Sequence, residues 1–135
     1  MTFAVNAIGT VVSPLTRLEE APRQGNEGAP SAWVEIAAHV EDALHGLAVG
    51  DDVVLLTWLD RSDRGVLKVH PRSDPNQPLT GVFATRSPDR PNPIGLHRVT
   101  VLAVDGPRLH VSALEALDGT PILDVKPALQ TIDER

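Results

Sequence analysis

The stretch GVFATRSPDRPNPIG, residues 81–95, contains three prolines within six positions, at 88, 91 and 93. Each proline fixes φ, removes a backbone donor and pushes the preceding residue toward extended geometry. The stretch is therefore predicted to be a stiff, extended loop and not a helix or a central strand. Gly81 and Gly95 bracket it, at points where the backbone is expected to turn or to approach another segment closely.

This loop carries two guanidinium groups, Arg86 and Arg90, and two small polar side chains, Ser87 and Asn92. A rigid loop that presents arginines can hold an anionic group without a large cost of ordering. The composition is equally consistent with a proline-stiffened surface turn, because prolines usually occur in loops. A binding loop and a plain turn both remain open from composition.

Short strands are predicted on both sides of the loop. The run DVVLLTWL at 52–59 is the strongest of them, and it is apolar enough to be buried on both faces. One short helix is expected over 39–47, because its apolar residues fall on one helical face and glycines follow them. The predicted strands are 3–12, 32–37, 52–59 and 66–70 before the loop, and 96–104, 109–114 and 122–125 after it.

This order of elements predicts a mainly antiparallel β-barrel, closed or nearly closed, with one short helix. The sequence contains no βαβ unit and no glycine-rich turn of the kind that opens a Rossmann sheet. Closing the sheet removes its exposed edges. A length of 135 residues fits a single domain, residues 1–135, with a core of its own. The polar connection 15–31 is long for a compact domain, which is typical of functional or disordered loops.

Several classes of site are disfavoured by composition. There are no cysteines, and the five histidines do not form a close-spaced ligand motif, so neither a disulfide framework nor a metal site is expected. No apolar run approaches the ~20 residues of a membrane helix. The first residues lack a basic flank followed by an apolar core, so a cytoplasmic location is predicted.

The net charge of −6 is unevenly distributed. Residues 61–98 contain seven Lys or Arg against three Asp, which gives +4 and leaves −10 for the rest of the chain. A basic segment on an acidic body can steer an anionic partner locally, provided that its charges lie on one face. The alternative, charges scattered over several faces, is also open.

Two sequence blocks in the chain resemble the signatures of the TsaA-like family, which includes the TrmO tRNA methyltransferases. The first block is FATRSP at 83–88 followed by RPNPIG at 90–95, and the second is LDGTPILDVKP at 117–127. The opening IGTVVSP at 8–14 and the step PRQ at 22–24 also fit, so the resemblance covers nearly the whole chain. It implies a small β-barrel that binds S-adenosylmethionine, typically as a homodimer with the cofactor near the subunit interface.

The resemblance and the chemistry of this cofactor together predict its binding residues. The resemblance implies that Arg23, Gln24 and the turn at 117–120 grip the cofactor. The ribose hydroxyls need an acceptor such as Asp60 or Asp118, and the carboxylate needs a donor such as Arg86 or an amide near Gly119. Asp60 is equally consistent with a solvated strand end, and the Asp118 turn with ordinary turn chemistry. The predicted cofactor-binding residues are Arg23, Gln24, Asp60, Arg61, Arg86, Leu117, Asp118, Gly119 and Thr120.

Arg90 and Asn92 are the candidates for catalytic residues, and two roles remain open for them. They hold either the incoming substrate or the cofactor of the partner subunit. No general base is assigned: His70 and His97 are the nearest titratable groups, and family members commonly have serine in place of His97. Asp124 and Lys126 share one face of a strand, as a structural ion pair or as a catalytic pair.

The resemblance implies a methyltransferase that N-methylates threonylcarbamoyladenosine next to the anticodon of tRNA. The sulfonium carries the difficult chemistry, so the protein must mainly align the nucleophile, the methyl group and the sulfur. Two alternatives are a methyltransferase of the same fold acting on a small molecule, and a non-catalytic module that senses S-adenosylmethionine. The chain departs from the family at Asp60, where histidine is frequent, and at Ala128, where tyrosine is usual; longer bacterial members add a C-terminal domain.

Overall fold

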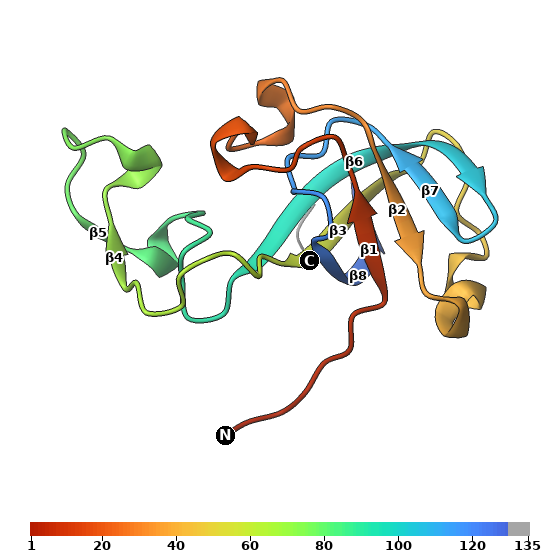
Figure 1. Ribbon diagram of the computed structural model, residues 1–135, viewed down its shortest axis with the longest axis horizontal. Helices are drawn as coiled ribbons and strands as arrows, with labels where there is room; N and C mark the ends of the chain where they lie inside the picture. Colours follow the sequence, from red (N-terminus) through yellow and green to blue (C-terminus); the bar gives the residue numbers. More distant parts are fainter. Residues whose placement is uncertain (130–135) are drawn as a thin grey trace.

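Six antiparallel strands close into a barrel in the computed structural model of the protein, which describes residues 1–129 (Figure 1). The strand order around the barrel is β1-β2-β7-β6-β3-β8, and β8 returns to pair with β1 through Gly9 and Ile122. The predicted antiparallel barrel is therefore confirmed. The strands are β1 Gly9–Val12, β2 Ala32–Ile36, β3 Asp52–Trp58, β6 Ile94–Asp105, β7 Arg108–Val111 and β8 Pro121–Pro127.

The core lies inside this barrel and is built from alternate side chains of its strands. Strand β3, which pairs with β6 on one side and β8 on the other, has three consecutive buried residues, 53–55, as its apolar run predicted. On β6, every second residue from Gly95 to Val101 is buried, which is the period expected of a strand with one face inward. The main core cluster includes Val11, Val34, Leu55, Val99, Val101, Leu109, Val111, Leu114 and Ile122.

Three predicted elements differ from the structure. The expected helix is a 3-10 segment, η3 Ala38–Leu44, which is too short for a stable α-helix, although Val40, Leu44 and Leu47 still pack on the core. The first strand begins at Gly9 instead of residue 3, because residues 1–7 are exposed and have no strand partner. The strand expected at 66–70 contracts to a short pair, described next, whose second member the sequence pattern did not indicate.

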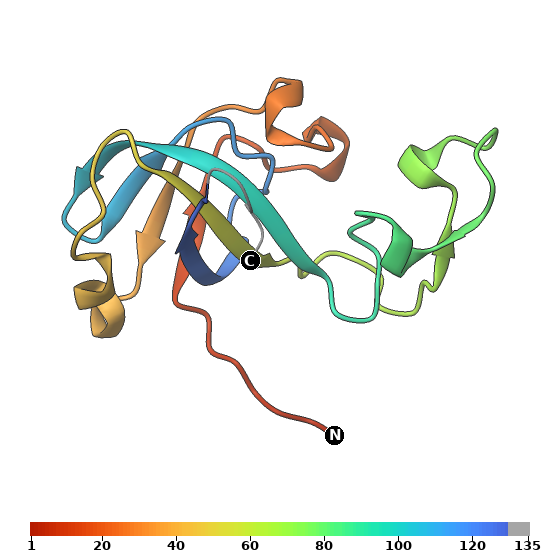
Figure 2. The same ribbon diagram turned by 180° about the vertical axis from the view of Figure 1, so that it is seen from behind.

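An insert between β3 and β6, residues 59–93, projects away from the barrel (Figures 1 and 2). It contains a two-stranded sheet of its own and two 3-10 segments. Within this insert, all of which the structure describes, only Val82 and Pro93 are buried. Its elements are β4 Lys68–Val69, η4 Pro71–Ser73, β5 Thr80–Gly81 and η5 Val82–Ala84.

Three connections, including the two longest, leave the barrel at one end, which we call the mouth. Strands β1, β3 and β7 run in the same direction, because each is antiparallel to a common neighbour. The connections that follow them therefore leave from the same end of the barrel: 13–31, 59–93 and 112–120. The first of these contains η1 Leu18–Glu20 and η2 Gly25–Glu27. The opposite end carries η3 and the short β6–β7 hairpin.

Candidate functional site

The mouth brings together segments from each part of the predicted site. Arg23 and Gln24 lie in the 13–31 loop, directly before η2, and both side chains are exposed. This loop is seated on the 112–120 segment at two points: the amide of Leu114 donates to the carbonyl of Pro30 at 2.9 Å, and Gly25 packs against the backbone of Ala113. The loop is thereby fixed against the connection that carries the Asp118 turn.

The turn at 117–120 is anchored to the end of β1. The carboxylate Oδ1 of Asp118 accepts from the amide of Ser13 at 3.0 Å, and the amide of Asp118 donates to the carbonyl of Leu15 at 2.7 Å. Gly119 adopts a φ of 83°, which only glycine takes without strain. Leu117 and Thr120 are buried beneath the turn. Asp118 therefore has a local structural role, which employs one of its two carboxylate oxygens.

Asp60 and Arg61 lie at the base of the insert, immediately beyond β3. Both are exposed, and Arg61 donates to the carbonyl of Thr16 at 2.9 Å, so the insert is tied to the same loop that Asp118 holds. Asp60 makes no side-chain hydrogen bond or ion pair to the residues that the structure describes. Its carboxylate is therefore available to a ligand at this rim.

The proline stretch is held in shape by two arginines. Arg90 folds back on its own loop and donates to the carbonyls of Val82, Thr85 and Ser87 at 2.7, 2.5 and 2.7 Å. Its donors serve the loop, in contrast to the substrate contact that is one of its predicted roles.

Arg64, which the sequence did not single out, braces the same stretch from outside. It donates to the carbonyl of Pro91 at 2.7 Å and to Oδ1 of Asn92 at 3.0 Å, while its guanidinium lies 5.1 Å from the ring centroid of Trp58. The amide group of Asn92 is thus partly engaged within the protein. Arg86 is different: it is exposed and has no hydrogen bond or ion pair within residues 1–129.

A buried polar chain at the mouth was not predicted. The hydroxyl of Thr57 lies 2.7 Å from Nε2 of His97, and Nδ1 of the same ring lies 2.5 Å from Oε1 of Glu115. Both ring nitrogens are thus occupied, and His97 is buried between strands instead of being free to act as a base. His70 is also engaged, with Nδ1 2.8 Å from the carbonyl of Gln77. Glu115 is a single acid among small and apolar residues, and that pattern carries no signal of function.

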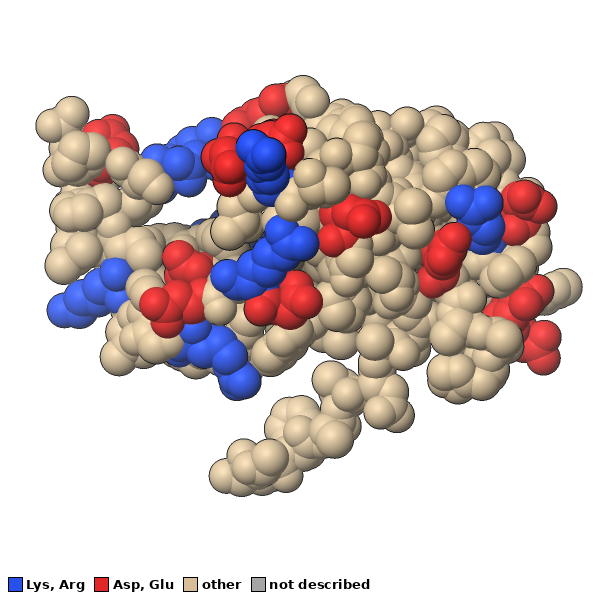
Figure 3. Space-filling view, in the orientation of Figure 1, with Lys and Arg blue, Asp and Glu red and all other residues tan. Residues whose placement is uncertain are grey.

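Charged side chains alternate in sign over the insert and the adjoining loops, as Figure 3 shows for one face. Arg72 on η4 pairs with Glu27 on η2 at 2.8 Å, and Arg98 lies 3.7 Å from Asp52. Of the seven cations predicted as a basic segment, only Lys68 and Arg86 lack a hydrogen bond or ion pair within the described chain. The face in view therefore carries no continuous positive patch.

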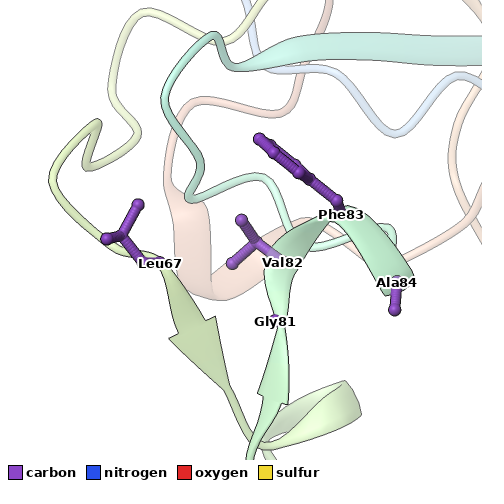
Figure 4. Close-up of a pocket in the computed structure, with 5 residues that line it drawn as sticks. All are labelled: Leu67, Gly81, Val82, Phe83 and Ala84. Carbon is purple, nitrogen blue, oxygen red and sulfur yellow. The ribbon is translucent and has the colours of Figure 1, made fainter.

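The insert also presents an apolar surface. A pocket of about 320 Å³ is lined by Leu67 and residues 81–84, and Figure 4 shows the side chains of Leu67, Val82 and Phe83 at the same end of the short sheet. Phe83 is 84% exposed, and Leu67 is 65% exposed. Large apolar side chains exposed together typically mark a surface that a partner covers.

The remaining predictions concern ion pairs and metals. Asp124 and Lys126 do pair, at 3.2 Å, and both are about half exposed on β8. No group of three or more potential metal ligands occurs among residues 1–129. Within the same residues, no helix is long and apolar enough to cross a membrane. Chemically, the mouth offers free carboxylate oxygens at Asp60 and Asp118, and the insert carries an exposed guanidinium at Arg86 that has no partner among residues 1–129.

Comparison with known proteins gives consistent matches over nearly the whole chain. Residues 10–134 match the family described as the tRNA-methyltransferase O N-terminal domain. A probable S-adenosyl-L-methionine-binding protein of Archaeoglobus fulgidus is 42% identical over 133 residues, which are 98% of this chain and 36% of that protein. A probable S-adenosyl-L-methionine-binding protein of Methanothermobacter thermautotrophicus is 38% identical over 133 residues, covering 98% of this chain and 95% of its own.

Solved structures show the same fold. A crystal structure of TrmO from Pseudomonas aeruginosa superposes with a TM-score of 0.78 at 30% identity, and the match covers all of this chain and 61% of that one. A second TrmO crystal structure gives a TM-score of 0.77 at 33% identity over 62% of its length. The chain therefore spans about three fifths of these structures and about a third of the first A. fulgidus relative.

Proposed function

Because this chain belongs to the tRNA-methyltransferase O N-terminal domain family, we propose that it binds S-adenosylmethionine and transfers its methyl group. The observation that carries the proposal is the convergence at one mouth of the 13–31 loop, the insert and the Asp118 turn, the three segments that contain the predicted cofactor residues. Relatives over most of this chain are named as S-adenosyl-L-methionine-binding proteins.

The polar side chains of the mouth and of the insert fit the polar groups of this cofactor. Arg86, which has no partner in the described chain, supplies a donor for the carboxylate. Asp60 and the free carboxylate oxygen of Asp118 supply acceptors for ribose hydroxyls or the ammonium group. Arg23 and Gln24 contribute exposed polar groups from the facing loop. When bound, the cofactor supplies an electrophilic methyl group on a sulfonium, so the protein's task is to orient it and an acceptor.

We infer that the acceptor is an adenosine in tRNA, in the threonylcarbamoyl form next to the anticodon. Support comes from the family description and from the two TrmO structures that share the fold. With Arg90 directed at its own loop, Asn92 is the member of the predicted catalytic pair that keeps more of its polar group free to meet a substrate. Because most cations of residues 61–98 are already paired within the protein, a contact made by a few placed side chains is expected instead of a broad basic surface.

A homodimer is proposed from the apolar surface of the insert. With only Val82 and Pro93 buried among residues 59–93, this segment has almost no core of its own. A second copy that covers Phe83 and Leu67 would bury apolar surface and hold the insert in place. Arg90 and Asn92 would then lie close to an interface between the two subunits.

Calorimetry and a transfer assay test these steps in order. Titration with S-adenosylmethionine should give one site per chain. Label from the methyl group should then enter bulk tRNA that carries the threonylcarbamoyl mark and should be absent from tRNA that lacks it. If the labelled methyl group enters only a pool of small metabolites, the acceptor is a small molecule and not tRNA. Binding without transfer to any pool would favour a sensor, a reading consistent with relatives named only for binding. Absence of binding would overturn the proposal.

A further inference from the structure

Three residues form a buried polar chain in the barrel wall below the mouth: Thr57 on β3, His97 on β6 and Glu115 in the 112–120 segment. Thr57 is fully buried, and the side chains of His97 and Glu115 are 4% and 16% exposed. A hydroxyl, an imidazole and a carboxylate in this order resemble a nucleophilic triad. The hydroxyl is sealed from solvent, however, so the chain cannot present it to a substrate.

The 13–31 loop rests on the carboxylate end of this chain. A Cβ added at Gly25 would collide with the carbonyl of Ala113 and would lie 3.3 Å from Oε2 of Glu115. Only glycine lets the loop come this close. Gly25 directly follows Gln24, so the position of two predicted cofactor residues, Arg23 and Gln24, depends on the surface that Ala113 and Glu115 form together.

The same carboxylate fixes the segment that leads to the Asp118 turn. Glu115 lies between Leu114 and Ala116, which are both buried in the barrel, and three residues before Asp118. Its bond to His97 ties this segment to β6, while the turn itself is bonded to Ser13 and Leu15. Glu115 therefore lies where the 13–31 loop, the segment leading to the Asp118 turn and the barrel wall meet.

The hydroxyl end of this buried polar chain reaches the proline stretch. Gly95 closes that stretch, and a Cβ added there would collide with Oγ1 of Thr57 and lie 2.6 Å from Nε2 of His97. Thr57 is followed closely by Asp60 at the base of the insert. The imidazole of His97 thus bonds Thr57 and Glu115, and these three side chains lie next to Gly95 at the end of the proline stretch and Gly25 in the 13–31 loop.

We propose that His97 and Glu115 are positioning residues that preorganise the mouth for S-adenosylmethionine, an inference that rests on the proposed function. A site whose loops are fixed beforehand has less ordering cost on binding than one whose loops must be ordered by the ligand. Loss of the carboxylate would remove the acceptor from Nδ1 of a buried ring and the support beneath Gly25. The 13–31 loop would then sample more conformations. The affinity for S-adenosylmethionine would fall, although no side chain that contacts the ligand is removed.

The variants Glu115→Ala and Glu115→Gln separate positioning from general stability. Glu115→Ala should weaken S-adenosylmethionine binding in calorimetry roughly tenfold. Glu115→Gln should stay within about threefold of the wild type, because its amide oxygen still accepts from the imidazole N–H. Val53→Ala is the matched control: this core residue lies at the opposite end of the barrel, so melting should fall while affinity stays within about twofold. Equal loss of affinity in Glu115→Ala and Val53→Ala would overturn the proposal.

A measurement without ligand keeps the result independent of the proposed function. In the free protein, Glu115→Ala should shift the backbone amide resonances of Gln24, Gly25, Asp118 and Gly119, and leave that of Gly106 in the distant hairpin unchanged. Unchanged resonances at the four mouth positions would refute positioning, whatever the wild type binds. If the variant shifts these resonances but the wild type binds no S-adenosylmethionine, the positioning role stands and the proposed cofactor is rejected.

Discussion

The absence of a side chain at Gly95 allows two polar side chains to pack against the backbone at the mouth. Its position on β6 faces two polar side chains, and an added Cβ would collide with Thr57 and lie 2.6 Å from His97. Gly81, which brackets the other end of the proline stretch, has no such constraint, since its nearest neighbour would be the carbonyl of Leu67 at 4.0 Å. The two glycines are equivalent in sequence and differ in what surrounds them.

Gly95→Ala is therefore expected to destabilise the protein by about 1–3 kcal/mol, the range found when extra atoms enter a packed core. Gly81→Ala should change stability by less than about 0.5 kcal/mol. Urea unfolding followed by circular dichroism measures both. Equal midpoints for the two variants would show that the contacts around Gly95 relax without cost.

Arg86 and Arg90 are separated by three residues and have different tasks. Arg90 satisfies three carbonyls of its own loop, whereas Arg86 has no partner in the described chain. Arg86→Ala should weaken S-adenosylmethionine binding by about 1.5–3 kcal/mol, the value of a charged hydrogen bond, and leave the melting temperature unchanged. Lys68→Ala, which removes the other unpaired cation of the insert, is the control and should bind as the wild type does. An unaltered affinity in Arg86→Ala would remove Arg86 from the site.

At the scale of elements, the proline stretch is rigid for a reason beyond its prolines. Arg64 bonds Pro91 and Asn92 and lies over Trp58, so it clamps the stretch against the base of the insert. The sequence predicted the stiffness from Pro88, Pro91 and Pro93, but it could not reveal Arg64, because an arginine at an exposed loop position has no periodic or motif signal.

Arg64→Ala should loosen residues 86–92 without unfolding the barrel. Loss of two exposed hydrogen bonds and a cation–π contact reduces the free energy of local opening by about 1 kcal/mol, which speeds amide exchange roughly fivefold. Hydrogen–deuterium exchange with mass spectrometry measures the change in peptides that cover this stretch. Arg17→Ala, at an exposed arginine without a side-chain partner in the described chain, should leave their exchange as it is.

The barrel strands were predictable and the insert was not. Strands β2, β3, β6 and β8 follow from apolar patterns, since each has a partner on both sides and a face toward one core. The pair β4–β5 has two residues per strand and little burial. Its geometry depends on turns and prolines, which produce no alternation of apolar and polar residues that could predict a strand. The candidate site follows the same division: the sequence motifs singled out Arg86, Arg90 and Asp118, whereas Glu115 and Arg64 make contacts between distant segments that no motif indicates.

The molecule as a whole combines a closed barrel with an exposed arm, which is the insert of residues 59–93. The arm carries Phe83 at 84% exposure and adjoins a pocket of about 320 Å³ lined by apolar groups. An arm with so small a core is expected to gain its order from a partner copy.

Phe83→Ser should shift the protein from dimer to monomer at micromolar concentration, because it removes the most exposed aromatic ring of the arm. Sedimentation velocity measures the change. Val49→Ser, an equally simple replacement at a 65% exposed residue on the opposite end of the barrel, should leave the sedimentation coefficient as it is. A wild-type protein that sediments as a monomer at all concentrations would contradict the proposed homodimer.

The pairing of Gly9 with Ile122 also bears on how the protein reaches its native state. The ring is completed by strands from nearly opposite ends of the polypeptide, so its last seam is a contact of very long sequence separation. Contacts of this kind form late and slowly, since chain entropy opposes them until the intervening strands are in place. During synthesis on the ribosome, the ring therefore stays open until β8 has emerged, and until then one edge of β1 is unpaired and open to association with other chains.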